Sequence, residues 1–172
     1  IWILVEGYLF SSNLWYIKAK VPFSFELYLE LFSRAFEFEV KNIIMNNLII
    51  DAARNSIFLT LIVNKNIYTS SYENSKSNFE KLIVIISEFL KKNKTTIKEI
   101  DKIYVNRGPG SFAGIRNSLA VVKGFFLVEK IDYYCFSFVD FNKSEMIKYE
   151  DVPNLCDKFK IKKNLINPLY LS

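Results

Sequence analysis

The residues best suited to chemistry gather around one glycine-rich loop. Four of the chain's five glycines lie within residues 102–126, at positions 108, 110, 114 and 124. Glycine concentrated in this way marks backbone that turns at positive φ or that another group approaches closely. Where such a loop enters a helix, successive N–H groups form a weakly positive hollow that suits a phosphate. A tight connection that binds nothing is the more frequent outcome of such spacing.

Charged side chains flank this loop. Arg107 and Arg116 stand on either side of it, and guanidinium groups clamp phosphates or carboxylates. The ordinary alternative for Arg116 is pairing with a surface acid. Asp51 ends an apolar stretch, where it either faces a cleft or caps the turn that follows. The candidate phosphate- or nucleotide-binding residues are therefore Asp51, Arg107, Gly108, Gly110, Ser111 and Gly114.

The composition argues against an autonomous hydrolase or metalloenzyme. The chain has no histidine, which is the commonest acid-base catalyst at neutral pH and the commonest metal ligand. Its two cysteines, Cys135 and Cys156, have no metal-binding spacing, so we expect reduced thiols in a cytoplasm. We assign no catalytic residue and no metal site.

Size, hydropathy and charge set broad limits. The 172 residues are 51% hydrophobic, enough for one sizeable core, yet no uncharged apolar run is long enough to span a membrane. Residues 1–44 hold four basic and five acidic residues, so the formal net charge of +5 comes from the rest of the chain. This excess of positive charge is consistent with weak attraction to RNA, and equally with ordinary solubility.

The hydrophobic pattern from Met45 onward predicts an α/β domain. Apolar and β-branched runs predict strands at 47–52, 56–63, 67–71, 101–106 and 132–136, and helical periodicity predicts helices from about 76 to 92 and from about 113. Asn64-Lys65-Asn66 marks a hairpin turn. We expect a mixed sheet in which an antiparallel meander is followed by strands that add in parallel through the two helices.

The two ends of the chain lack such a pattern. Residues 1–44 show no clean period, and Met45 stands directly before a well-patterned strand, so we expect a spurious extension or a segment outside the domain. The alternative is a real aromatic-rich amphipathic helix at 25–38. Residues 141–164 are rich in lysine, which predicts a solvated surface or loose tail. We therefore divide the chain into residues 1–44, 45–140 and 141–172.

Both predicted helices carry more apolar surface than one sheet can cover. On the second helix, Ile115, Leu119, Val122 and Phe126 form one stripe, and Val121, Phe125 and Val128 form another. The first helix carries Val84 and Ile85 beyond a main stripe of residues 79, 82, 83, 86, 89 and 90. The extra surface must meet the other helix, a missing lobe or a partner. The candidate partner interface is Val84, Ile85, Ala113, Ala120, Val121, Gly124, Phe125 and Val128.

The loop and its flanks resemble the signature of the TsaB family, the bacterial partner subunit in tRNA threonylcarbamoyladenosine synthesis. That family carries a strand, the run G-R-G-P-G-S-F-T-G-L-R and an alanine-rich helix ending in K-G. Residues 106–116 read N-R-G-P-G-S-F-A-G-I-R, and Lys123-Gly124 closes the helix. The resemblance covers about 45–140, with a weaker echo of the family's terminal P-L-Y-L at 168–171.

This resemblance implies that residues 45–140 form the N-terminal lobe of an actin-like, sugar-kinase-like ATPase fold. The second lobe is largely missing, and residues 141–172 are a truncated remnant of it or a C-terminal tail. The resemblance also implies a cytoplasmic, non-catalytic scaffold subunit whose helices pack on the catalytic paralogue TsaD as a four-helix bundle. The tRNA would be contacted only indirectly, further complex members could join this heterodimer, and no membrane is involved. No cofactor is certain; ATP or ADP at the interface with the partner is the one that the resemblance allows.

The chain departs from the family at the expected nucleotide cleft. In actin-like ATPases an aspartate such as Asp51 helps to hold a metal-bound nucleotide phosphate. The family usually reads I-D-T-S there, whereas Asp51 is followed by Ala52-Ala53, and the family's histidine near the first helix is absent. Only 32 residues follow Asp140, against roughly a hundred in the family.

Two other function classes stay open. The chain could be a fragment of an actin-like small-molecule kinase or ATPase, which measurable ATP turnover would support. It could also be a basic RNA-binding module, in which lysines would gather on one face with exposed aromatic residues. Candidates for such a face are the lysines at 91, 92, 94, 98, 102, 158, 160, 162 and 163.

Overall fold

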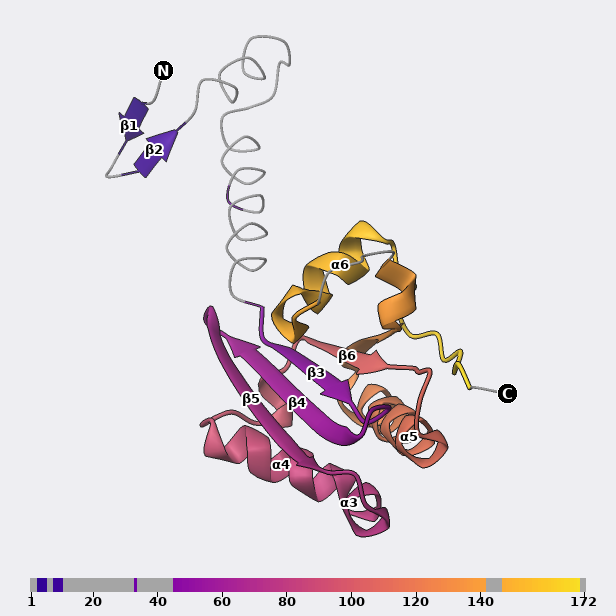
Figure 1. Ribbon diagram of the computed structural model, residues 1–172. Coiled ribbons are helices and arrows are strands. Elements are labelled where there is room, and N and C mark those ends of the chain that lie inside the picture. Colours follow the sequence, from indigo (N-terminus) through magenta and orange to yellow (C-terminus); the bar gives the residue numbers. More distant parts are fainter. Residues whose placement is uncertain (1–2, 6–7, 11–32, 34–44, 142–146, 171–172) are drawn as a thin grey trace. The chain divides into compact units, whose positions relative to one another are not determined.

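The computed structural model describes residues 3–5, 8–10, 33, 45–141 and 147–170. The chain divides between Asn42 and Ile43 into two units, and each is described by itself (Figure 1). In the first unit, β1 (Ile3–Val5) and β2 (Tyr8–Phe10) form an antiparallel pair. The alternative helix over 25–38 lies outside the described residues, except for Ser33.

The second unit is built on a five-stranded mixed sheet. Its strands are β3 (Asn47–Asp51), β4 (Ser56–Val63), β5 (Asn66–Glu73), β6 (Lys102–Asn106) and β7 (Asp132–Phe136). They lie in the order β5-β4-β3-β6-β7. The pairs β3–β4 and β4–β5 are antiparallel, while β3–β6 and β6–β7 are parallel. The expected α/β class and the meander followed by parallel strands are confirmed.

The β4–β5 hairpin closes through a two-residue loop. Val63 pairs with Asn66, and the intervening Asn64 and Lys65 have φ values of 50° and 67°. Two successive residues at positive φ match the right-handed twist of the strands, and asparagine tolerates that conformation better than most residues. This turn fixes the register between β4 and β5.

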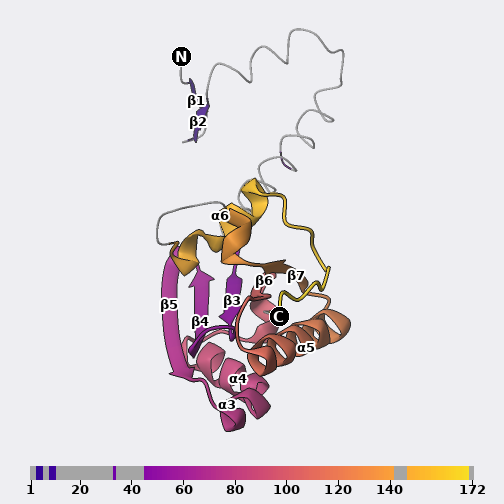
Figure 2. The same ribbon diagram turned by 45° about the vertical axis from the view of Figure 1, so that its right-hand side comes forward.

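Three helices cover one face of the sheet (Figures 1 and 2). They are α3 (Lys76–Glu80), capped by Ser75, α4 (Leu82–Lys92), and α5 (Phe112–Glu129). A short 3-10 turn, Ile97–Glu99, follows α4 and begins with a capping box between Thr96 and Glu99. The core on this face combines β-branched strand residues with one stripe from each helix, including Leu82, Phe89, Ile115, Leu119 and Val122.

The single helix expected over 76–92 is interrupted at Lys81, and this changes which residues are exposed. Because α4 restarts at Leu82, its buried residues are 82, 85, 86, 89 and 90, which follow the helical i, i+3, i+4 spacing. Ile85 is therefore buried, with 8% of its surface exposed, and the expectation that it lies outside the core is wrong. Ile83, assigned to the main stripe, is instead 52% exposed.

The opposite face of the sheet is covered by the C-terminal part of the chain. A 3-10 helix at Phe138–Phe141, another at Tyr149–Asp151 and α6 (Val152–Lys158) lie over it. Val152, Leu155 and Cys156 are buried against Ile49, Tyr104 and Phe136 in a second core. The prediction of a solvated surface or loose tail is wrong for residues 149–158. Because α6 is only seven residues long, its apolar residues span too few helical turns for a periodic pattern to be recognised in the sequence.

No helix within the described ranges has the length and hydrophobicity needed to cross a membrane.

Candidate functional site

The glycine loop joins β6 to α5, and its N–H groups are used within the protein. The N–H of Gly108 donates to Asn106 Oδ1 at 3.0 Å. Ser111 N donates to the Ala53 carbonyl at 2.7 Å, and Gly114 N donates to Ser111 Oγ at 3.3 Å, which caps α5. The hollow expected for a phosphate is thus partly closed by internal hydrogen bonds.

Close backbone packing requires three glycines, two in the loop and Gly114 in the first turn of α5. A Cβ atom at Gly110 would lie 1.9 Å from the Ala53 carbonyl oxygen, and one at Gly114 would lie 1.8 Å from that of Ala52. Gly108 has φ of +108°, and a Cβ there would lie 2.2 Å from the Leu169 carbonyl oxygen. No side chain fits at these distances. The glycines therefore let the loop pack against the end of β3 and against the C-terminal segment, which favours the alternative of a tight connection.

Arg107 fastens the loop to two other segments. Its Nη2 lies 2.7 Å from Asp140 Oδ1, and its Nη1 donates to the Asn167 carbonyl at 3.1 Å. Its own carbonyl accepts from Leu169 N at 2.8 Å. Arg116, by contrast, is exposed on α5. Arg107, one half of the predicted clamp, is therefore used to pack the C-terminal segment.

Asp51 is fully buried at the end of β3, and both of its oxygens accept hydrogen bonds. Oδ1 accepts from Ala53 N at 3.0 Å, which is the turn-capping alternative of the sequence analysis. Oδ2 accepts from the Tyr149 hydroxyl at 2.7 Å and lies 3.3 Å from Arg54 Nε. Burial, and then the charge of Asp51, raise the pKa of Tyr149 well above its usual range. The tyrosine therefore stays protonated as a donor.

Sequence reasoning missed Tyr149, Arg54 and Phe138, which surround this carboxylate. The Tyr149 ring stacks on Phe58 with centroids 5.6 Å apart, and the Arg54 guanidinium lies 4.2 Å from the centre of the Phe138 ring. A metal-bound phosphate at Asp51 would have to displace both Tyr149 and Arg54. The residues present do not fit such a ligand. Within the described ranges no three His, Cys, Asp or Glu side chains are grouped to hold a metal ion.

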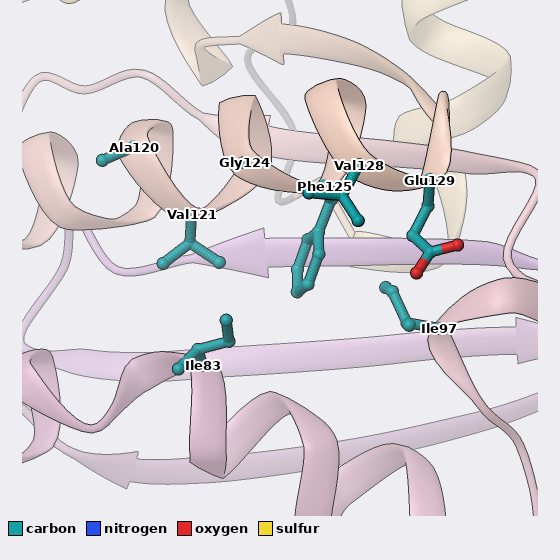
Figure 3. A pocket seen from close by; sticks show the side chains of 8 residues that line it. All are labelled: Ile83, Ile97, Ala120, Val121, Gly124, Phe125, Val128 and Glu129. Atoms are coloured by element: carbon teal, nitrogen blue, oxygen red, sulfur yellow. The ribbon is translucent and has the colours of Figure 1, made fainter.

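The other candidate site is an apolar groove between α4 and α5 (Figure 3). It has a volume of about 490 Å³. It is lined by five of the predicted interface residues, Ala120, Val121, Gly124, Phe125 and Val128. Three further residues, Ile83, Ile97 and Glu129, line it as well and were not predicted to belong to an interface. We call this set of eight residues the α4–α5 groove.

Large apolar side chains are exposed on the helices that form the groove. Val128 is 76% exposed at one end of it, and Ile83 projects toward it from α4. Val84 beside Ile83 and Leu127 beside Val128 are exposed as well. Val121 and Phe125 are half-buried, so part of the second stripe is already covered by the chain's own core. Ala113 is exposed at the start of α5, outside the groove.

Comparison with known proteins points to one group of relatives. The family model described as "TsaD: tRNA N6-adenosine threonylcarbamoyltransferase" matches residues 69–140. The tRNA threonylcarbamoyladenosine biosynthesis protein TsaB of Buchnera aphidicola subsp. Baizongia pistaciae is 40% identical over 62 residues, which are 31% of this chain and 28% of that protein. The matched part is therefore less than a third of the curated relative.

Solved structures agree on the fold. YeaZ from Pseudomonas aeruginosa superposes with a TM-score of 0.51 at 19% identity, over 55% of this chain and 44% of that one. A protein described as similar to peptidase YEAZ, also from Pseudomonas aeruginosa, gives 0.52 with the same identity and coverage. At this identity the likeness establishes the architecture alone, that of one lobe of an actin-like fold.

Proposed function

We propose that this chain belongs to the TsaB family and is the non-catalytic scaffold subunit of a tRNA N6-threonylcarbamoyladenosine modification complex. Its partner is a TsaD-type catalytic subunit, with which it forms a heterodimer. Further members of the complex join through this pair, and the tRNA is reached through the partner.

The α4–α5 groove is the observation that carries this proposal. Two helices that lie side by side carry exposed apolar side chains in or beside this groove. Water solvates such a surface poorly. A pair of helices from another protein would cover such a surface and, with α4 and α5, complete a four-helix bundle. Association would bury Ile83, Val84, Leu127 and Val128 together.

The composition of the chain and the surroundings of Asp51 support a non-catalytic role. The chain has no histidine, and its buried strand-end carboxylate is held by Tyr149 and Arg54. The same arrangement disfavours the alternative of a kinase or ATPase fragment that uses Asp51. Any ATP or ADP in the complex would then lie at the interface with the partner, held mainly by partner residues.

Two substitutions in the groove test the partner interface. Val128→Asp and Ile83→Asp place a charge where association would exclude water, while both side chains are already largely exposed in the lobe. We expect each to weaken association with a purified TsaD-type protein at least about 30-fold, the loss typical of an interface hot spot. Titration calorimetry measures the dissociation constant, and circular dichroism verifies that each variant is folded.

Matched controls lie elsewhere on the same lobe. Val139→Asp and Ile67→Asp make the same chemical changes at side chains that are 61% and 46% exposed but outside the groove. They should bind as the wild type does. Undiminished association of both groove variants, or equal losses in the controls, would refute the docking surface.

A further inference from the structure

The two outer strands of the sheet differ in how the rest of the chain covers them. Beside β7, Asn164 N donates to the Tyr133 carbonyl at 2.8 Å, and Tyr133 N donates to Asn164 Oδ1 at 3.0 Å. Lys163 forms a β-bridge with Tyr134 on the same side. At the other end of the sheet, no described segment bonds to the outer side of β5 between Asn66 and Tyr72 (Figures 1 and 2). The β7 edge is therefore covered, and the β5 edge is open.

The hairpin geometry identifies the open backbone groups of β5. Val63 and Asn66 close the two-residue turn as a hydrogen-bonded pair. Along an antiparallel ladder such pairs alternate with pairs that exchange no hydrogen bonds. The N–H and C=O groups of Ile67, Thr69 and Ser71 therefore point away from β4, toward the open edge.

The β5 edge lacks the features that usually protect an edge strand. Natural edges carry a bulge, a proline or a central lysine, which discourage pairing with another chain. β5 pairs with β4 over its eight residues without a bulge, and its one charged residue, Glu73, stands at its end. Ile67 and Tyr68 add apolar surface that is 46% and 38% exposed. Such an edge is suited to accept a further strand.

Independently of the proposed function, we infer that β5 pairs antiparallel with β5 of a second copy of this chain, about a two-fold axis at Thr69. In this register Ile67 lies opposite Ser71 of the second copy, and Thr69 lies opposite its own counterpart. Every outward N–H and C=O group of Ile67, Thr69 and Ser71 then has a partner.

Other registers satisfy fewer of these groups. A shift by two positions in one direction leaves the backbone of Ser71 unpaired. The opposite shift requires the carbonyl of Glu73, which already accepts from Ser75 N at 3.1 Å and from Asn78 Nδ2 at 2.8 Å. Shifts by one position would place outward groups opposite groups that point back into the sheet.

The side chains also match in this register. Lys65, in the turn, lies opposite Glu73 of the second copy, so opposite charges face each other at both ends of the pairing. Tyr68 lies diagonally from Tyr68 and Tyr72 of the second copy, at a separation that aromatic rings can bridge. This match of charge and of hydrogen-bonding groups favours a second copy over a strand from an unrelated protein.

The first test reverses the two charges in the full chain. Lys65→Glu and Glu73→Lys each place like charges opposite each other, so each should raise the dissociation constant of the dimer roughly threefold or more. An equimolar mixture of the two variants restores opposite charges and should associate as the wild type does. Lys162→Glu, exposed in the segment beside the β7 edge, is the matched control and should change nothing.

Sedimentation equilibrium measures these constants. The paired strands form a smaller contact than a standard interface, so the association is weak and the measurement extends to millimolar protein. Recovery in the mixture cannot come from damage to the fold, because each variant is then present in the form that fails alone.

The second test follows single amide protons by NMR hydrogen exchange. In dilute solution the amides of Ile67, Thr69 and Ser71 should exchange quickly, while those of Tyr68 and Ser70, which are bonded to β4, stay protected. Raising the protein concentration should slow exchange several-fold at the three outward amides alone. Ser71→Pro removes an outward donor without breaking a bond to β4, and it should prevent this slowing.

The outcomes distinguish this pairing from the groove and from the proposed function. A chain that stays monomeric at millimolar concentration, with its outward amides unprotected, overturns the pairing. Self-association that Val128→Asp and Ile83→Asp abolish, but that the β5 variants leave unchanged, places the contact in the α4–α5 groove and also overturns it. The β5 variants should bind the TsaD-type protein as the wild type does, so failure of the pairing leaves the scaffold role standing.

Discussion

At the scale of single residues, the glycines of one motif perform different tasks. Gly108, Gly110 and Gly114 allow backbone segments to approach more closely than a side chain permits. Gly124 faces open space. The sequence shows only that glycines are concentrated here, and a phosphate cradle, a tight connection and a docking surface all use glycine for the same steric reason.

Gly114→Ala should therefore destabilise the lobe. Its Cβ would lie 1.8 Å from the Ala52 carbonyl oxygen, and because the opposing atom belongs to a strand end, the backbone must move. We expect a loss of about 1–3 kcal/mol in the free energy of unfolding. Chemical denaturation measures it, with Gly124→Ala as the matched change in the same helix. Equal effects of the two substitutions would contradict this account of the loop.

The Asp51–Tyr149 hydrogen bond leads to a second prediction. Tyr149→Phe keeps the ring on Phe58 but removes a donor from a buried carboxylate, which should cost about 1–3 kcal/mol of stability. In a double-mutant cycle with Asp51→Asn, the two losses should not add, because both variants disrupt the same contact. Additive losses measured by urea denaturation would show that the pair is not coupled.

At the scale of elements, the strands were predictable because their apolar runs are bounded by turn residues. β4 and β7 have the predicted bounds, and the others differ by a few residues. The break at Lys81 was not predictable, since Phe79, Leu82, Ile83 and Ile86 fit one continuous helix. The contact between Asp51 and Tyr149 was also hidden, because Tyr149 is 98 residues away in a segment without a periodic signal. Local pattern does not encode such a long-range contact.

The β4–β5 turn gives an element-scale prediction. Lys65 has φ of 67°, a conformation that costs a lysine more than a glycine. Lys65→Gly should raise the free energy of unfolding by up to about 1 kcal/mol, because Asn-Gly is the preferred sequence for this two-residue turn. Thermal denaturation tests this, and Lys162→Gly, outside any turn that closes a hairpin, should not stabilise. If Lys65→Gly instead lowers the free energy of unfolding, Lys65 does not adopt a positive φ in this turn.

At the scale of the whole molecule, two cores on opposite faces of one sheet hold a cysteine each. Cys135 and Cys156 are buried, and burial raises the pKa of each thiol to about 12. In the unfolded chain both would titrate near 9.0. The neutral thiols thus contribute stability that is fully present below the unfolded value and is lost as the pH rises toward 12.

Stability should accordingly fall with alkaline pH. Between pH 9 and 11 each thiol adds a slope approaching about 1.4 kcal/mol per pH unit, because only the unfolded state releases its protons. Urea midpoints measured across this range should therefore decrease, and Cys135→Ala and Cys156→Ala should each make the decrease shallower. A slope that neither substitution changes would show that these thiols are accessible in the folded lobe.

The N-terminal 44 residues allow a separate prediction at this scale. We propose that they contribute nothing to the core of the lobe, because every strand and helix of that core lies between Asn47 and Lys158 among the described residues. A chain starting at Met45 should unfold with the same midpoint as the full chain. A decrease of several degrees, equivalent to more than about 1 kcal/mol, would show that the extension is part of the domain.

The most direct test of the scaffold role measures threonylcarbamoyladenosine in tRNA. Unmodified tRNA is incubated with the remaining components of the reaction and with this chain alone, a TsaD-type protein alone, both, or the TsaD-type protein with the Val128→Asp variant. We expect no product with this chain alone, and more product with both wild-type proteins than with the TsaD-type protein alone or with the variant. Transfer by this chain without a partner, or equal product whether or not it is present, would contradict the scaffold role.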